Sequence, residues 1–372
     1  MKKILKTKII DKKFIKGILK ERDLLSKLNH PFIVNMHFSF QDNQYLYMIL
    51  DLKKGGDLRY YYKLYEKNNK IFTENECNFM VSNLLLALEY IHINNIVHCD
   101  IKPENIVIGK NGYFYLTDFD ISVNLTDEDK NKKNNNHSSN NNYIVGSLGY
   151  MAPEIMFQEK INLSVDYFSL GVICYEMMMG KLPYFAKGIE DIKKLVMANQ
   201  VIIKKFDIPQ GWSSEAADFI NKLIQRKPYK RLGYNNIEEI KHHPWLKEVD
   251  WKKIYLHEFK SPFIPDLNKK AFNNIYFNDK KKEYEETKNT LERYKAIESN
   301  KDNNIIFDEF YYYNKYSMKF KKENDIFTNP HIKYEEKDSK SISLNSNLNN
   351  NNKISRNRNN FNNHRYCLTS NI

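Results

Sequence analysis

The sequence predicts an α+β fold in which residues 1–50 mix a helix with strands and residues 51–262 are mainly helical. Of the 372 residues, 41% are hydrophobic and 14% aromatic, which supplies a sizeable core and excludes a wholly disordered chain. The length favours about two domains. Asn- and Ser-rich segments at 127–142 and 336–372 interrupt the globular pattern, and they predict a loop and a disordered tail.

In residues 1–50, a helical stripe and an apolar run define the expected elements. Glu21 lies on the same helical face as four apolar residues. A carboxylate on a buried face requires a cationic partner, so Glu21 predicts an ion pair. The run Tyr45–Leu50 predicts a buried strand. The apolar residues of the helical face are Phe14, Ile18, Leu25 and Leu28.

The central region combines two long apolar helices with a hairpin. Residues 77–91 carry one apolar helix face, and residues 165–179 are apolar nearly all round. The second stretch is too short to span a membrane, so it predicts a helix inside a globular lobe. Residues 106–108 and 113–116 predict strands joined by a turn at 109–112.

Charge and cysteine content limit the class of function. Lys and Arg total 58 against 46 Asp and Glu, a net charge of +12, which alone leaves open binding to nucleic acid or to an anionic membrane. A general excess of Lys and Asn explains this charge more simply, so no nucleic-acid partner is expected. Four scattered cysteines without a C-x-x-C pair favour a reducing compartment over zinc or disulfides. Neither a membrane-spanning run nor a signal peptide is recognised.

Five motifs stand in a fixed order over more than 130 residues. A chance match to one of them carries no weight, but the ordered set is specific. It resembles the catalytic loop, the magnesium motif, the end of the activation segment, the start of the central helix and its buried arginine in protein kinases. The motifs are His98-Cys99-Asp100 with Lys102-Pro103-Glu104-Asn105, then Asp118-Phe119-Asp120, Met151-Ala152-Pro153-Glu154, Asp166 to Gly171, and Arg231, placed to pair with Glu154.

The resemblance to protein kinases implies a bilobal fold. Residues 1–50 would form a partial, β-containing small lobe and residues 51–262 a mainly helical large lobe. Residues 263–320 would form a C-terminal tail of the AGC group, followed by a low-complexity, disordered tail at 321–372. Further runs resemble the AGC group and, within it, the YANK kinases, and one run resembles the AGC hydrophobic motif that docks on the small lobe. These are Asn29 to Val34, Gly55 to Tyr60, Asp118 to Ser122 and the hydrophobic motif Phe307 to Asn314.

The same resemblance assigns roles in phosphoryl transfer. Asp100 would orient the substrate hydroxyl, and Lys102 would lie beside the transferred group. Asn105 and Asp118 would bind Mg²⁺, since their hard oxygens suit that ion. Lys2, with a one-residue ambiguity toward Lys3, would pair with Glu21. The other residues expected to bind ATP are Leu50, Asp51, Lys53 and Val107.

Substrate contacts follow from the resemblance as well. Ser147 would hydrogen-bond Asp100 and Lys102. Asp57 and Glu104 lie where basophilic AGC kinases hold substrate arginines. Three cations near these carboxylates leave a preference for acidic substrates open, namely Lys53, Lys54 and Arg59.

Three departures from the kinase pattern bear on activity. Cys99 replaces the arginine that binds an activation-loop phosphate. Asp120 replaces a glycine, where an aspartate tolerates positive φ less well. None of the 12 glycines forms a G-x-G, so the glycine-rich loop is expected upstream of Lys2 and the chain is expected to be truncated.

The sequence therefore predicts a serine/threonine protein kinase that uses ATP and Mg²⁺ on protein substrates. The alternative is a pseudokinase or scaffold without turnover, because the glycine-rich loop is missing and Asp120 stands in the magnesium motif. The expected location is cytoplasmic, at a membrane only if an upstream lipidation signal exists.

Overall fold

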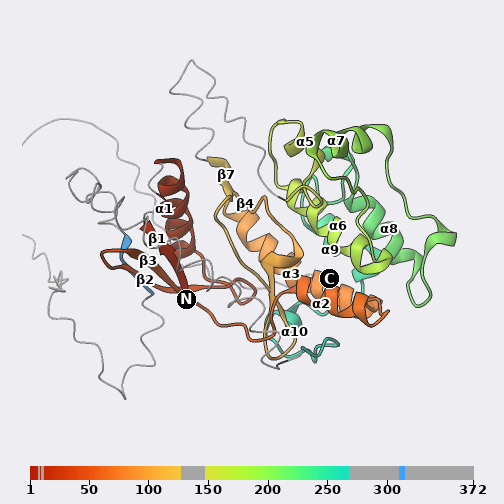
Figure 1. Cartoon of the computed structure of the whole chain (residues 1–372). Helices are drawn as coiled ribbons and strands as arrows, with labels where there is room; N and C mark the ends of the chain where they lie inside the picture. The colour runs from red at the N-terminus through yellow and green to blue at the C-terminus, as the bar shows by residue number, and fades with distance from the viewer. Residues whose placement is uncertain (7–8, 10–11, 127–146, 266, 268–309, 315–372) are drawn as a thin grey trace, which may run out of the picture. The chain divides into compact units, whose positions relative to one another are not determined.

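The computed structural model describes residues 1–6, 9, 12–126, 147–265, 267 and 310–314, all of which lie in the unit Met1–Phe320 (Figure 1). The predicted loop 127–142, the tail 321–372 and most of 263–320 lie outside these residues. The strands are β1 (Lys2–Leu5), β2 (Met36–Gln41), β3 (Tyr45–Leu50), β4 (Ile96–Val97), β5 (Ile106–Ile108), β6 (Phe114–Leu116), β7 (Val123–Asn124) and β8 (Tyr312–Tyr313). The α-helices are α1 (Lys12–Lys27), α2 (Leu58–Lys67), α3 (Glu74–Ile93), α5 (Pro153–Met156), α6 (Ser164–Met179), α7 (Ile189–Ala198), α8 (Ser214–Leu223), α9 (Glu238–Lys241) and α10 (Trp251–Tyr255). The 3₁₀ turns are η2 (Pro103–Asn105), η3 (Lys205–Asp207), η4 (Pro228–Lys230) and η5 (Pro244–Leu246).

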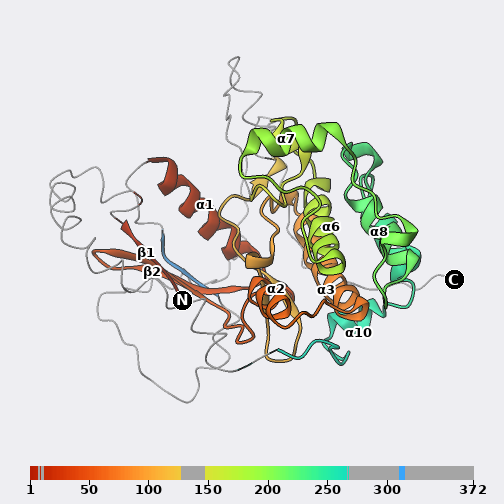
Figure 2. The ribbon, with the colours of Figure 1, turned by 45° about the vertical axis from the view of Figure 1, so that its right-hand side comes forward.

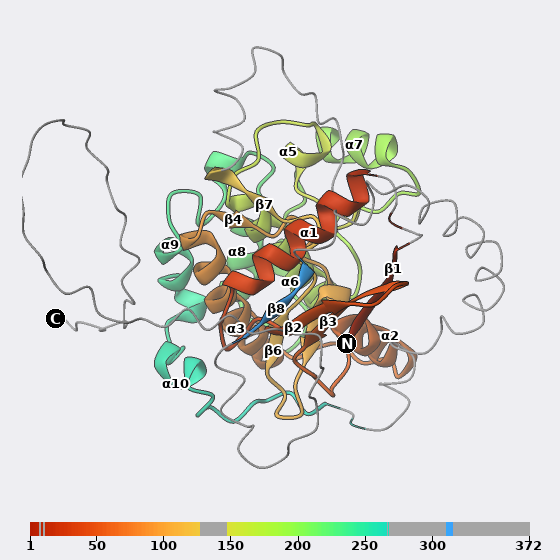
Figure 3. The same ribbon diagram turned by 90° about the vertical axis from the view of Figure 1, so that its left-hand side faces the viewer.

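The N-terminal region is built on an antiparallel sheet with strand order β1-β3-β2-β8. Figure 3 shows β8 lying along β2 at the edge of this sheet, although the two strands are far apart in the sequence. The predicted buried strand Tyr45–Leu50 is present as β3, and its residues are buried or half-buried. Only Leu46 and Met48 are fully buried, because successive side chains point to opposite faces of the sheet. Tyr47 lies on the other face and stacks on Phe40 of β2.

Helix α1 supplies the buried carboxylate that the helical stripe predicted. Leu25 and Leu28 are buried and Ile18 is partly buried, whereas the side chain of Phe14 lies outside the described part. Glu21 is 2% exposed on the same face. The amphipathic pattern therefore places one ionisable group in the interior of the small lobe, where it requires a cation.

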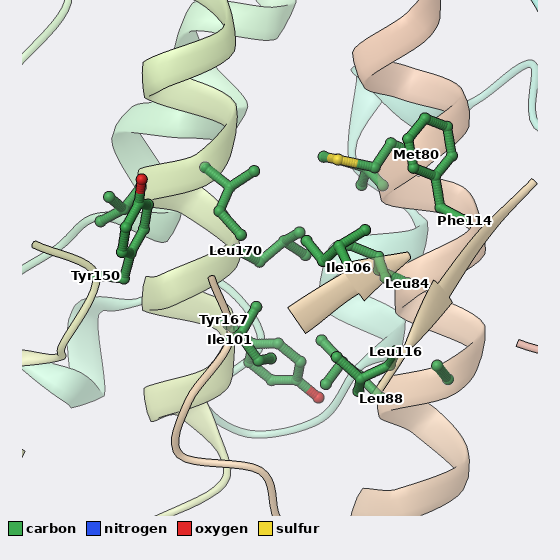
Figure 4. Packing of buried hydrophobic residues seen from close by; sticks show 14 of the residues in the cluster. Met80, Leu84, Leu88, Ile101, Ile106, Phe114, Leu116, Tyr150, Tyr167 and Leu170 are labelled. Atoms are coloured by element: carbon green, nitrogen blue, oxygen red, sulfur yellow. The ribbon is translucent and has the colours of Figure 1, made fainter. Parts of the chain in front are cut away.

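The large lobe is centred on α3 and α6, which run side by side (Figure 2). Figure 4 shows Met80 and Leu84 of α3 on the side that faces α6, and β6 of the β5–β6 hairpin packs against α3. Every residue of α6 from Ser164 to Met178 is buried, which confirms the predicted central helix.

Close packing and a tight turn explain two glycines of the large lobe. A Cβ on Gly171 would lie 2.6 Å from the Cβ of Leu223, so this glycine lets α6 approach α8. The predicted hairpin is confirmed as β5 and β6, with β6 beginning at Phe114 rather than at Tyr113. Gly112 in its turn has φ +79° and lies directly against the carbonyl of Phe263.

Candidate active site

Asp166, in the first turn of α6, anchors the loop that carries the expected catalytic residues. Its Oδ2 accepts a hydrogen bond from the backbone N–H of His98 at 2.9 Å, and its Oδ1 accepts one from Cys99 at 3.0 Å. The Nε2 of His92 lies 2.8 Å from Oδ2. Asp166 is fully buried, and Cys99 has a positive φ of +66°. Because a non-glycine residue at positive φ is strained, the paired carboxylate helps to hold this turn.

Asp100 is the most firmly positioned carboxylate of the loop. Its Oδ2 accepts hydrogen bonds from Lys102 Nζ and, at 3.0 Å, from Asn105 Nδ2. Its Oδ1 accepts two from Ser147, from the backbone N–H and from Oγ, each at 3.1 Å. Asp100 is 7% exposed. The sequence-predicted residues Asp100, Lys102, Asn105 and Ser147 are therefore brought together in one cluster, in which the carboxylate of Asp100 accepts hydrogen bonds from the other three.

The two residues expected to bind Mg²⁺ each offer an oxygen atom. Asn105 donates both its amide hydrogen bonds to Asp100, at 2.9 and 3.0 Å, so its Oδ1 is left as an acceptor without a donor among the described residues. Asp118 has φ +68° and a side chain 37% exposed. An amide oxygen and a carboxylate fit a hard ion that also takes phosphate and water ligands. Within the described ranges, no cluster of three or more His, Cys, Asp or Glu residues is present that would bind a metal without such ligands.

Lys2 of β1 joins α1 to this region. Its Nζ lies 2.7 and 2.8 Å from the two oxygens of Glu21 and 3.4 Å from Oδ1 of Asp118. Burial lowers the pKa of Lys2, but the carboxylates of Glu21 and Asp118 outweigh it and raise that pKa overall. Burial raises the pKa of Glu21, and the ammonium of Lys2 opposes this effect. Lys3 lies instead 3.6 Å above the ring of Tyr45, so the structure pairs Glu21 with Lys2.

Asp120 adds a third carboxylate close to these groups. Burial raises its pKa, the negative charges of Asp118 and Asp100 raise it further, and the ammonium of Lys2 lowers it. Asp120 has an ordinary negative φ, whereas Asp118 takes the left-handed conformation. The backbone strain expected from replacing glycine at position 120 is therefore absent, and the effect of this substitution is electrostatic.

The residues expected to bind the nucleotide lie at the end of β3 and on β5. Leu50 and Val107 are half-buried and pack against the core. Asp51 is bonded to its surroundings rather than free, with His37 Nε2 at 2.7 Å and Lys53 Nζ at 3.4 Å. Burial raises the pKa of Asp51, but these partners lower it overall. The ammonium of Lys53 also lies 3.7 Å above the ring of Tyr115.

Of the expected substrate residues, Asp57 has a clear structural role. It is the N-cap of α2 and accepts a hydrogen bond from the N–H of Tyr60 at 2.8 Å. Burial raises the pKa of its carboxyl group. Glu104 lies in η2 between Lys102 and Asn105, with a side chain that is 44% exposed and an oxygen 2.9 Å from Nε of Arg59.

Two polar clusters of the large lobe complete the site. The predicted pair of Glu154 and Arg231 is confirmed, with Nη1–Oε1 at 2.6 Å and Nη2–Oε2 at 3.0 Å. The second cluster joins Arg59 to Tyr150 and Glu176, and sequence reasoning did not assign it. The available signal was Glu176 itself, an acidic residue inside an otherwise apolar helix, which requires a partner.

Comparison with known proteins assigns the chain to the family that the site residues resemble. Residues 1–246 match the family model described as the protein kinase domain. The chain is 39% identical over 265 residues to a probable serine/threonine-protein kinase of Dictyostelium discoideum, a match covering 71% of this chain and 54% of the relative. It is 37% identical over 251 residues to mouse ribosomal protein S6 kinase alpha-2, covering 67% of this chain and 32% of that protein. It thus spans about half or a third of the length of these relatives.

Proposed function

This chain belongs to the protein kinase family, and from this premise we propose that it transfers the γ-phosphoryl group of ATP to serine or threonine side chains of proteins. Its relatives are named serine/threonine-protein kinases and ribosomal protein S6 kinases, and the family generally uses ATP with Mg²⁺. The observation that carries the proposal is the position of Asp100 at the start of the loop that resembles a kinase catalytic loop, where its carboxylate accepts hydrogen bonds from Lys102, Asn105 and Ser147.

Each residue of the site then has one task. The nucleotide with its ion supplies the phosphoryl group and neutralises charge. Asp100 accepts a hydrogen bond from the substrate hydroxyl and orients it, and Lys102 places a positive charge beside the same carboxylate. Asn105 Oδ1 and Asp118 are the oxygens that would hold Mg²⁺. Lys2, fixed by Glu21, directs its ammonium toward Asp118 and the phosphates.

Nucleotide contacts are proposed for Leu50, Asp51, Lys53 and Val107. Leu50 and Val107 offer apolar surface to an adenine ring, and Asp51 with Lys53 offers backbone groups at the end of β3. Asp57, Glu104 and Ser147 are proposed to lie beside the bound protein substrate. Support comes from their links to the Asp100 loop, since Ser147 contacts Asp100 directly and Glu104 shares the η2 turn with Asn105.

Asp100→Asn tests the proposed transfer. Asparagine keeps the shape of the side chain but cannot accept the hydroxyl proton, so the transfer rate is expected to fall by about 10²–10⁴-fold. ATP affinity should change little. Asp250→Asn, the same substitution at the exposed N-cap of α10, is the matched control and should retain activity. Wild-type activity in purified Asp100→Asn protein would refute the proposed mechanism.

Asp118→Ala tests the magnesium ligand. Removing this carboxylate should abolish the gain in nucleotide affinity that Mg²⁺ gives, measured by calorimetric titration with and without the ion. An unchanged magnesium-dependent affinity would exclude Asp118 from the metal site.

A kinase fold without turnover is the second candidate function, and Asp120 is the observation that favours it. Its carboxylate lies in the electrostatic range of Asp118, Asp100 and Lys2, where it opposes the approach of phosphate groups. Asp120→Gly should therefore gain transfer activity if this carboxylate silences the enzyme. A wild-type protein that is already active, with no gain on this substitution, would exclude the second candidate.

We also propose membership of the AGC group, close to the YANK kinases, with a C-terminal tail at 263–320. Support for the branch is the pair of motifs Gly55 to Tyr60 and Asp118 to Ser122. Support for the tail is residues 310–314: Phe310 is fully buried, its carbonyl accepts from Ser39 Oγ at 2.6 Å, and β8 pairs with β2. No helix in the described part of the chain is long and apolar enough to cross a membrane.

A further inference from the structure

Arg59 makes contacts that the transfer reaction does not use. All three nitrogens of its guanidinium are engaged. Nε donates to Glu104 Oε1 at 2.9 Å, Nη1 donates to Glu176 Oε1 at 3.0 Å, and Nη2 donates to the hydroxyl of Tyr150, which in turn donates to Glu176. We call these four residues the Arg59 cluster. They come from α2, η2, the segment before α5, and α6, so one side chain bridges four parts of the large lobe.

The Arg59 cluster lies beside the catalytic carboxylate. Glu104 follows Asp100 by four residues in the same loop, and Tyr150 follows Ser147, which bonds Asp100, by three. Four residues span at most about 14 Å. Two or three residues of an extended peptide cover roughly 7–10 Å, so a substrate whose hydroxyl lies at Asp100 passes within side-chain reach of Glu104.

The cluster also reaches the surface on this side. The side chain of Glu104 is 44% exposed and that of Arg59 is 23% exposed, whereas Glu176 is only 11% exposed. An approaching peptide therefore meets Glu104 first, with Arg59 already bonded to it. Glu176 is less exposed, and its two oxygens accept hydrogen bonds from Arg59 and from Tyr150.

The charges of the cluster are those of a site for a guanidinium. Two carboxylates and a tyrosine hydroxyl present acceptors to one planar donor, which is the geometry that arginine satisfies better than lysine. Burial lowers the pKa of Arg59, but the neighbouring Tyr150 and Glu176 raise it overall, so the group is charged. A second guanidinium could bind only by displacing Arg59, which is tethered to the site and so competes at a high effective concentration.

We propose that Arg59 occupies, from within the chain, an acidic site beside the catalytic loop that would otherwise hold an arginine of the protein substrate. The inference rests on the proposed transfer function and adds its substrate selectivity. A substrate arginine next to the acceptor gains nothing in the wild-type kinase, because Arg59 already occupies the space between the two carboxylates and donates a hydrogen bond to each of them. Removal of the Arg59 guanidinium opens the site and creates selectivity for arginine.

The test is a single-arginine scan with the full chain. Peptides carry one acceptor serine in an alanine background, with arginine at one of the positions within four residues of the serine. The measured quantity is the ratio of kcat/KM between each arginine peptide and the all-alanine peptide, so changes in basal rate cancel. The wild type should show a ratio near one at every position. Arg59→Ala should raise the ratio at least about tenfold at one position, equivalent to about 1.4 kcal/mol.

Further variants and a matched control identify the cause. Arg59→Met removes the guanidinium but keeps an unbranched apolar side chain in its place, so it is expected to disturb the packing less than Arg59→Ala. It should show the same gain, which tests the proposal even if Arg59→Ala fails to fold. Adding Glu104→Gln to either variant should remove most of the gain, because it removes one of the two carboxylates. Arg226→Ala is the matched control, since this guanidinium donates to the carbonyls of Val196 and Met197 and not to the cluster. Its ratios should equal those of the wild type.

Two results would overturn the proposal: a wild-type ratio of ten or more at one position, or Arg59 variants whose ratios equal the wild-type ratios throughout. If no protein phosphorylates any peptide, the proposed transfer function fails, and binding decides the selectivity separately. Fluorescein-labelled peptides measured by polarisation should then bind Arg59→Met more tightly with arginine than with alanine. Equal affinities for the two peptides would refute the role of Arg59 independently of transfer.

Discussion

Removal of the buried cation at Arg231 should destabilise the large lobe more than any surface charge change. The side chains of Arg231 and Glu154 are 0% and 1% exposed. Arg231 also donates to the carbonyl of Ser164 at 2.8 Å and to that of Gln225 at 3.1 Å. Arg231→Met leaves a buried carboxylate and two carbonyls without these donors, for which a loss of about 3–5 kcal/mol is expected. At about 2–4 °C per kcal/mol, Tm should fall by about 6–20 °C.

A double-mutant cycle separates the ion pair from simple packing loss. Glu154→Gln alone leaves Arg231 buried and charged, so it should also be costly. The double variant should cost less than the sum, because it leaves neither charge without a partner. Lys222→Met is the matched control, since this pair with Asp218 has the same 2.6 Å separation but side chains about half exposed, and it should cost less than about 1 kcal/mol. Additive single effects, or an Arg231→Met loss as small as the control, would refute this reasoning.

Three further outcomes are expected. Burial lowers the pKa of His30 to about 4, so stability should be full above pH 6.5 and fall by about 3 kcal/mol as the pH drops toward 4, where the unfolded state alone takes up the proton. Urea denaturation across this range should show a smaller fall in His30→Asn and a normal one in the exposed His242→Asn. Phe310→Ala should undock β8, and hydrogen exchange at the N–H of Asn314, which bonds the carbonyl of residue 37, should become fast; unchanged protection would show that the ring does not anchor the segment. Phosphatase treatment should leave the rate of the active kinase nearly unchanged, because Cys99 offers no cation to an activation-loop phosphate, and a large loss of rate would contradict this.

The fold was predictable because its signals are local. The stripe around Glu21, the apolar helix at 165–179 and the hairpin at 106–116 each depend on a periodicity within one element, and all three are present. The alternation of burial along β3 was not predictable, because an apolar run does not reveal which faces of a strand are covered. That depends on neighbouring elements, such as β1 and β2, whose positions are not encoded in the run itself.

The candidate site likewise contains residues that the sequence predicts and residues that only the tertiary structure brings together. Motif order places Asp100, Asn105 and Asp118 because their spacing along one loop and hairpin is short. The Arg59 cluster was not predictable, since its bonded members are separated by 26 to 117 residues and its contacts depend on how α2 meets α6. The only local signal was the presence of two acidic residues, Asp166 and Glu176, in an otherwise apolar helix. Each of these residues was certain to need a polar partner, but no sequence pattern identified the partners of Glu176.

The replacement of arginine by Cys99 shows why the loop keeps its shape although the motif is altered. Asp166 holds the loop through the backbone N–H groups of His98 and Cys99, at 2.9 and 3.0 Å, and its own carboxylate is bonded to the ring of His92 in α3. A backbone donor is present whatever the side chain, so the anchor does not depend on an arginine at position 99. The substitution therefore leaves the anchor of the loop intact and places no cation at position 99. The position of Asp100 is set by hydrogen bonds within the large lobe, and residue 99 offers no cation that an activation-loop phosphate could bind. This is the physical reason to expect a kinase that needs no activation-loop phosphate.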